Sequence, residues 1–235
     1  MSRAAVFLDA GGVLVDPNWS RVSEALLRHG VAVSSAALAA AEPLAKRALD
    51  TPELVRTTSD HTRGWKYFNL VLEHAGIALS DATDRALADL HEYHRRSNLW
   101  ETVPPGVPEA LDRLRALGLT LVVASNANGT VRAHFDRLGL AARFDLVLDS
   151  HDIGIEKPDP AFFAHGLRAI GLRAEDALHV GDFYSIDVVG ARAAGLEAWL
   201  IDVAGVNGDR DCPRFPSLAA VVDRIEADRA QQDAR

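Results

Sequence analysis

Residues 4–14 read Ala-Ala-Val-Phe-Leu-Asp-Ala-Gly-Gly-Val-Leu, a short apolar run that is closed by Asp9 and two glycines. Such a run is typical of a buried strand in a parallel sheet. Ligands of open parallel sheets bind just beyond the carboxyl ends of the strands, and glycines there let the backbone approach a ligand closely. We therefore expect Asp9 at a strand tip facing a crevice, although an aspartate that merely caps the turn would give the same local pattern.

From Pro104 onward the chain alternates between strand-like and helix-like segments. Strands are expected at 120–124, 144–148, 177–180 and 197–201, and helices at 107–117, 130–138, 160–170, 187–194 and 217–230. Strands separated by helices of this length form right-handed crossovers and a parallel sheet. The first strand, residues 4–9, cannot be stable alone and is expected to join these later strands.

The segment between these two parts has helical periodicity and no strand pattern. Helices are expected at 19–29, 36–49, 63–74 and 81–95, with breaks at Gly30, Pro52 and Gly76. The expected fold class is α/β, with a doubly wound, Rossmann-like parallel-sheet core at residues 1–16 and 100–235. An all-helical domain at 17–99 is inserted after the first strand, where it would act as a lid over the strand tips.

Composition narrows the class of protein. The 235 residues carry a net charge of −8, which disfavours a nucleic-acid partner. Acidic and basic residues are equal in number over 17–99, so the excess of acid belongs to the core. Cys212 is the single cysteine, which excludes an intrachain disulfide and fits a reducing cytosol. Since we see no signal peptide and no apolar run of membrane-spanning length, we expect a cytoplasmic protein with no membrane partner.

Polar residues follow four of the expected strands. They are Asp9 after the first, Ser125 and Asn126 after the second, Lys157 in the loop after the third, and Asp182 with Asp187 after the fourth. The carboxyl ends of parallel strands lie at one edge of a sheet, so we expect these groups to converge. A hydroxyl, an ammonium and several carboxylates suit a phosphate together with Mg²⁺, which prefers one or two carboxylates plus phosphate oxygens and water.

Four motifs resemble those of the haloacid dehalogenase-like hydrolase superfamily. They read F-L-D-A-G-G-V-L (7–14), V-V-A-S-N (122–126), E-K-P-D-P (156–160) and V-G-D-F-Y-S-I-D-V-V-G-A-R-A-A-G (180–195). Each motif is weak alone, and the last is the most specific. Together they occur in the order and at the strand ends of that family, across the whole core. The helical insert is similar to the first-position cap of the family's subfamily I.

The resemblance implies a phosphatase that acts on a small phosphorylated metabolite. Asp9 would attack phosphorus and carry an aspartyl-phosphate. Asp9, the backbone carbonyl of Gly11 and Asp182 would bind Mg²⁺, which neutralises the charge between nucleophile and substrate. Asp187 would lie on the metal side as a further ligand, or would orient Lys157 or a metal-bound water.

The same resemblance implies a set of phosphate-binding groups. These are Ser125, Lys157 and the backbone N–H groups of Gly11, Gly12 and Asn126. Lys157 would also anchor Asp9. His179 precedes the fourth strand's glycine and aspartate, and we expect it to pack inside the sheet rather than to take part in catalysis.

Gly11 departs from the family pattern. The family's phosphatases usually carry a second aspartate at this position, which acts first as general acid and then as base. The absence of such a group typically costs about 10²–10⁴-fold in rate. The implied metal ligand survives the change because it is a backbone carbonyl.

Three interpretations remain open at this stage. The chain is a phosphatase whose acid is replaced by water, the substrate or a cap residue; a phosphonatase-like C–P hydrolase that uses a cap lysine, Lys46 or Lys66; or a catalytically weak binding or regulatory protein. A dehalogenase is disfavoured, because that branch usually has an aromatic residue in place of Gly11 and lacks the acidic pair Asp182 and Asp187. The sequence assigns neither a substrate nor an oligomeric state.

Overall fold

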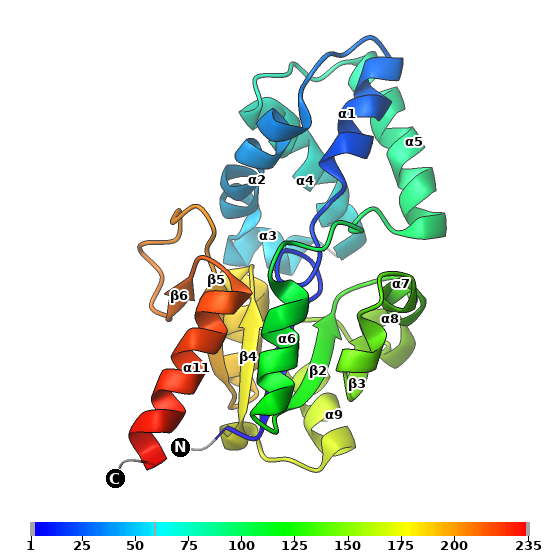
Figure 1. Ribbon diagram of the computed structural model, residues 1–235. Coiled ribbons are helices and arrows are strands. Elements are labelled where there is room, and N and C mark those ends of the chain that lie inside the picture. Colours follow the sequence, from blue (N-terminus) through cyan, green and yellow to red (C-terminus); the bar gives the residue numbers. More distant parts are fainter. Residues whose placement is uncertain (1–2, 59, 234–235) are drawn as a thin grey trace. The chain divides into compact units, whose positions relative to one another are not determined.

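The computed structural model describes residues 3–58 and 60–233, which belong to two compact units (Figure 1). One unit combines the chain up to Asp16 with the chain from Val103 onward. The other unit is the intervening segment, Pro17–Thr102. The candidate nucleophile, metal ligands and phosphate-binding residues all lie in the first unit, which we call the core unit.

The core unit contains a six-stranded parallel sheet. Its strands are β1 (Ala5–Leu8), β2 (Thr120–Ser125), β3 (Leu146–Asp149), β4 (Ala177–Gly181), β5 (Glu197–Ile201) and β6 (Arg214–Phe215). Their order across the sheet is β3-β2-β1-β4-β5-β6, and every neighbouring pair is parallel. This arrangement confirms the predicted α/β class, and it places β1 between β2 and β4 at the centre.

Helices cover both faces of this sheet. They are α6 (Val107–Ala116), α7 (Val131–Arg137), α8 (Ser150–Ile153), α9 (Pro160–Ile170), α10 (Val189–Ala193) and α11 (Leu218–Asp233). Helices α6 and α11 pack together on one face, in front of the sheet in Figure 1. Helices α9 and α10 contact each other and contribute to the buried cluster on the other face.

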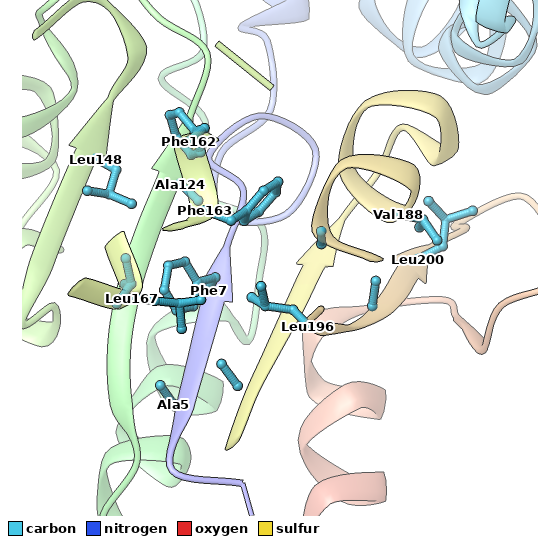
Figure 2. Packing of buried hydrophobic residues seen from close by; sticks show 14 of the residues in the cluster. Ala5, Phe7, Ala124, Leu148, Phe162, Phe163, Leu167, Val188, Leu196 and Leu200 are labelled. Atoms are coloured by element: carbon cyan, nitrogen blue, oxygen red, sulfur yellow. The ribbon is translucent and has the colours of Figure 1, made fainter. Parts of the chain in front are cut away.

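The buried cluster under α9 is built from alternate residues of the strands. Phe7 of β1 and Leu148 of β3 meet Phe163 of α9 there, and all three are buried (Figure 2). Gly166 lets the helix come close, since a Cβ at this position would lie 2.5 Å from Leu148 Cδ1 and 2.7 Å from Phe7 Cε1. This packing fixes the central strand whose end carries Asp9.

The second unit is helical. Its elements are α1 (Trp19–Arg28), α2 (Ser35–Leu49), α3 (Pro52–Thr57), α4 (Asp60–His74) and α5 (Asp81–Ser97). Helices α2 and α4 pack against each other, and Tyr67 of α4 donates its hydroxyl to Glu42 of α2 at 2.6 Å. We call this segment the helical unit.

Glu101 ties the two ends of the helical unit together. Its Oε1 accepts hydrogen bonds from Asn18 Nδ2 and Arg21 Nε, both at 2.9 Å, and its Oε2 accepts the hydroxyl of Tyr93 at 2.7 Å. The guanidinium of Arg21 also lies 3.9 Å from the ring centroid of Tyr93. Hydrogen bonds from three donors hold this carboxylate in its charged form.

Several short elements differ from the sequence predictions. The sequence analysis did not identify α3, α8 or β6, because elements of two to six residues show too little periodicity to be recognised. The helix predicted from Asp187 begins earlier, as a π-helical turn η3 (Tyr184–Val188) that continues into α10. None of the helices in residues 3–58 and 60–233 has both the length and the apolar character of a membrane crossing.

Candidate active site

Asp9 lies directly beyond the end of the central strand. Its backbone N–H donates to the carbonyl of Val180 in β4 at 2.9 Å, so the residue is still held by the sheet. The chain then turns sharply: Gly12 has a φ of 70°, a conformation open to glycine, and donates to Val15 at 2.9 Å. Gly11 and Gly12 therefore form the turn beside Asp9, where the sequence analysis placed them.

Lys157 links two carboxylates in the interior of the core unit. Its Nζ donates to Asp9 Oδ1 at 2.8 Å and to Asp187 Oδ1 at 2.7 Å. The side chains of Lys157 and Asp187 are 2% and 1% exposed, while that of Asp9 is 14% exposed. Ion pairs this deeply buried need well-aligned hydrogen bonds to offset desolvation, and this ammonium has two.

Asn126 holds the backbone of Lys157. Its Nδ2 donates to the carbonyl of Lys157 at 2.9 Å, and its Oδ1 accepts the N–H of Lys157 at 2.8 Å. The side chain thus pairs with both the N–H and the C=O of one residue, as a neighbouring strand would. Asn126 follows β2, so this pair connects the end of that strand to the loop that carries the lysine.

Asp187 accepts three hydrogen bonds and contacts a fourth polar group. Its Oδ1 takes the Nζ of Lys157 and faces His179 Nε2 at 3.1 Å. Its Oδ2 accepts the N–H groups of Asp182 and Phe183 at 3.2 and 2.9 Å. Since an ionised carboxylate offers about four lone-pair positions, this set fully employs the side chain.

His179 lies inside the sheet, as the sequence analysis expected, but it also contacts the site. The residue is 0% exposed in β4, in register with Phe7 of β1. Besides the contact with Asp187, its Nδ1 lies 3.1 Å from the carbonyl oxygen of Phe7. The ring packs edge-on against Phe163 with centroids 4.9 Å apart. The sequence analysis missed the contact with Asp187, whose signal was a polar residue on a strand face that is otherwise apolar.

Electrostatics in this group follow from burial and from the four charges. Burial raises the pKa of Asp9 to about 8, and the charge of Lys157 only partly opposes this rise. For Lys157, burial disfavours the ammonium, but the charges of Asp187 and Asp9 outweigh it and raise the pKa. For Asp187, burial is likewise outweighed by the charge of Lys157 and the hydrogen bond of His179, so its pKa is lowered. Burial lowers the pKa of His179.

Three carboxylates come close enough to face one cation. One oxygen from each of Asp9, Asp182 and Asp187 lies within 4.8 Å of the others. Mg²⁺ binds oxygens at about 2.1 Å, so these carboxylates would have to draw closer together to hold one ion. When all three carboxylates are ionised, the ammonium of Lys157 leaves the group with an excess of two negative charges, which one divalent cation would neutralise. The donor set consists of hard oxygen ligands and fits Mg²⁺.

Ser125 ends the strand next to β1. It is 5% exposed and lies in register with Asp149 of β3. The carboxylate of Asp149 accepts the N–H groups of Gly129 and Val131, at 2.9 and 3.4 Å, and so fixes the loop that follows Asn126. The structure thus brings Asp9, Lys157, Asp182 and Asp187 into direct proximity, and it places Ser125 and Asn126 at the neighbouring strand end.

Comparison with known proteins matches this chain to one family of hydrolases. A family model described as haloacid dehalogenase-like hydrolase matches residues 4–195. The chain is 36% identical over 149 residues to ribulose-1,5-bisphosphate 5-phosphatase of Halopiger xanaduensis, covering 62% of this chain and 60% of that one. It is 39% identical over 140 residues to phosphoserine phosphatase of Thermus thermophilus, covering 58% of this chain and 53% of that one. The match thus spans less than two thirds of either relative.

Solved structures share the whole architecture. A 2-haloacid dehalogenase from Pseudomonas syringae pv. Tomato is 29% identical and superposes with a TM-score of 0.59, covering 97% of this chain and 99% of that one. A likeness of this extent covers both the core unit and the helical unit. Two relatives are therefore named as phosphatases and one structural neighbour as a dehalogenase, and the site's chemistry has to discriminate between them.

Proposed function

The chain belongs to the haloacid dehalogenase-like hydrolase family, and we propose that it is a Mg²⁺-dependent phosphatase for a small phosphomonoester. One observation carries this proposal: Asp9 at a strand tip is hydrogen-bonded to the buried Lys157 and lies within one cation's reach of Asp182. A nucleophilic carboxylate, a fixed ammonium and an additional carboxylate are the groups that phosphoryl transfer to aspartate needs.

Magnesium would be held by Asp9, Asp182 and the backbone carbonyl of Gly11. When bound, it would neutralise the charge that keeps an anionic nucleophile away from an anionic substrate. Asp187 fits the role of an orienting group better than that of a ligand, because its oxygens already accept hydrogen bonds from Lys157 and from the N–H groups of Asp182 and Phe183. We therefore assign Asp187 to the positioning of Lys157.

The chain's own groups supply the remaining functions. Asp9 attacks phosphorus as the bond from phosphorus to the leaving oxygen breaks, and water then attacks the phosphorus of the aspartyl-phosphate to release phosphate and regenerate Asp9. Lys157, held at its backbone by Asn126 and at its Nζ by Asp187, stabilises the negative charge of the transferring group. Ser125 and the backbone N–H groups after β1 and β2 are proposed to bind the phosphoryl oxygens.

The proton for the leaving oxygen has to come from water or from the substrate. Gly11 offers no side chain at the position where the family's phosphatases usually carry an acid. Such an enzyme hydrolyses good leaving groups, such as acidic phenols, more readily than simple alkoxides, because a good leaving group departs without a proton. This expectation separates the chain from relatives that retain the second aspartate.

Dehalogenation is the competing chemistry, since one structural neighbour bears that name. In that reaction a carboxylate attacks carbon and displaces halide from a substrate that is itself a carboxylate. The excess of negative charge around Asp9 would repel such a substrate unless a cation were present. The acidic cluster therefore favours a phosphate ester bound together with a metal.

We also propose that the helical unit selects the substrate. It is inserted into the chain directly after the loop that follows Asp9. This placement couples any movement of the insert to the residues beside the nucleophile. A cytoplasmic location is proposed on the single cysteine alone, which fits a reducing compartment.

A panel of phosphorylated metabolites, with p-nitrophenyl phosphate as a general probe, tests the proposed function. We expect turnover in Mg²⁺, its loss in EDTA and its recovery when Mg²⁺ is returned. A 2-chloropropionate arm and a phosphonoacetaldehyde arm test dehalogenase and phosphonatase chemistry. Halide release without phosphatase activity would replace the proposal with dehalogenation, and failure of every arm would indicate a binding protein.

A further inference from the structure

His179 is a buried polar residue that the phosphatase chemistry above does not use. It lies in β4 with 0% exposure, and its ring rests on the edge of Phe163. Burying an imidazole costs free energy unless its nitrogens find partners. Phenylalanine or leucine would fill the space without that cost, so packing alone does not account for this side chain.

The contacts of His179 lead to the nucleophile in three steps. Its Nε2 lies 3.1 Å from Oδ1 of Asp187. The same oxygen accepts Nζ of Lys157 at 2.7 Å, and that Nζ donates to Asp9 at 2.8 Å. Oδ1 of Asp187 therefore contacts both His179 and Lys157. A change in the contact with His179 would shift this oxygen, and with it the ammonium of Lys157.

Besides His179, the contact described for Oδ1 of Asp187 is Nζ of Lys157, the group whose position has to be explained. The backbone N–H groups of Asp182 and Phe183 hold Oδ2, at 3.2 and 2.9 Å. The terminal torsion of an aspartate is broad, so a carboxylate held mainly through one oxygen can turn about it. A second donor on Oδ1, fixed within the sheet, removes that freedom. His179 is fixed in this way, because its strand is hydrogen-bonded on both sides, and with a proton on Nε2 it would be such a donor.

We propose that His179 is a positioning residue, which donates from Nε2 to Asp187 and thereby fixes Lys157 against Asp9. Its effect on rate rests on the proposed phosphatase function, whereas the hydrogen bond itself does not. Both ring nitrogens face an acceptor and a neutral ring carries one proton, which we place on Nε2 because the carboxylate of Asp187 is a stronger acceptor than the carbonyl of Phe7; Nδ1 then makes no hydrogen bond to that carbonyl.

A matched pair of variants separates the two ring contacts. The amide nitrogen of glutamine occupies roughly the place of Nε2, and that of asparagine roughly the place of Nδ1. His179→Gln keeps a donor for Asp187, whereas His179→Asn keeps only the group near Phe7. Leu200→Val, in the neighbouring strand and equally buried, is the control for loss of packing.

Steady-state kinetics with p-nitrophenyl phosphate and Mg²⁺ give the first test. We expect His179→Asn to lower kcat by about 10- to 100-fold, as loss of an outer-shell partner typically does. KM should change little, and His179→Gln should recover most of the lost rate. Urea unfolding shows whether each variant is folded. A folded His179→Asn enzyme with wild-type kcat, or a glutamine variant no better than the asparagine variant, would overturn the proposal.

Nitrogen-15 NMR of histidine-labelled protein gives a second test that does not depend on turnover. The proposal requires a proton on Nε2 of His179, with a coupling or an exchange-protected signal that is lost in Asp187→Asn. A ring protonated only on Nδ1 would overturn it. If wild-type protein hydrolyses no phosphomonoester while the Nε2 signal is present, the proposed function fails and the hydrogen bond stands.

Discussion

The carboxyl group of Asp187 lies against the bare Cα of Gly181. A Cβ at position 181 would come within 2.1 Å of Asp187 Cγ and 2.4 Å of its Oδ2. No side chain other than hydrogen can occupy that space while Asp187 stays where it is. The glycine at the end of β4 is thus a requirement of the carboxylate that binds Lys157, and the fold and the site are coupled at this point.

Gly181→Ala tests that coupling. The added methyl has to displace Asp187, so we expect a loss of about 1–3 kcal/mol in the free energy of unfolding, as for other overpacked sites. Phosphatase activity should fall further than stability does, because Lys157 loses its fixed position. Gly208→Ala is the control, since no atom lies within 4 Å of a Cβ there. Equal, small effects in both variants would show that Asp187 moves without consequence.

Removal of the Lys157 ammonium is expected to lower the free energy of unfolding, and removal of the charge on Asp187 in the same protein should recover part of that loss. Lys157→Met leaves Asp9 and Asp187 buried without their shared ammonium, and breaking a buried pair costs about 3–5 kcal/mol. Adding Asp187→Asn removes one of the stranded charges and should restore part of the loss. Urea unfolding in EDTA compares the wild type, the single variants Lys157→Met and Asp187→Asn, and the double variant. If the double variant lost as much stability as the two single variants together, Lys157 and Asp187 would not interact as described.

Gly11→Asp is expected to add a missing catalytic function. The left-handed backbone conformation at this turn belongs to Gly12, with a φ of 70°, so the backbone at position 11 does not itself require glycine. An acid there should raise kcat for alkyl phosphates, within the range of about 10²–10⁴-fold that general acids supply. Gly11→Asn is the matched control, with the same shape and no acid. A similar gain in both variants would point to a structural effect.

Stability of the helical unit should depend on pH through Glu101. Burial acts to raise the pKa of this carboxyl, but the hydrogen bonds from Tyr93, Arg21 and Asn18 outweigh it and lower the pKa below the ordinary value of 4.5. A lowered pKa in the folded state stabilises the protein above the ordinary value, and the contribution is lost as pH falls through the folded value.

Glu101→Gln checks this sign. Thermal or urea unfolding of wild type and variant at neutral pH should show the wild type to be more stable. The difference should shrink as the pH is lowered below 4.5. A difference that stays constant over this range would mean that the charge of Glu101 contributes nothing and that only its shape matters.

Periodicity and motif order predicted much of the core. The α/β class, the parallel pairing of β1 with later strands and the strand-tip position of Asp9 all follow from apolar runs closed by polar or glycine residues. Helix α9 and strand β5 begin and end where predicted, because proline and glycine mark the ends of the helix and a compact apolar run marks the strand.

Contacts between distant side chains could not be predicted in the same way. The pairing of Asn126 with the backbone of Lys157, and the link from His179 to Asp187, depend on side-chain direction and on atomic distances that no periodicity encodes. The π-helical start of the segment after Asp182 was likewise hidden, since it follows from Asp187 folding back over Gly181. The family resemblance had implied that Lys157 anchors Asp9 and that Asp187 could orient Lys157, and both contacts are present; the partners of Asn126 and His179 came from tertiary packing alone.

The most direct test of the central claim is the trapping of a phosphorylated intermediate. Wild-type protein is mixed with p-nitrophenyl phosphate and Mg²⁺, quenched in acid within one turnover and examined by peptide mass spectrometry. The account predicts one added phosphoryl group on the peptide that contains Asp9, none in EDTA and none in a folded Asp9→Asn variant. Turnover that continues in Asp9→Asn, or a phosphoryl group found on a different residue, would contradict it.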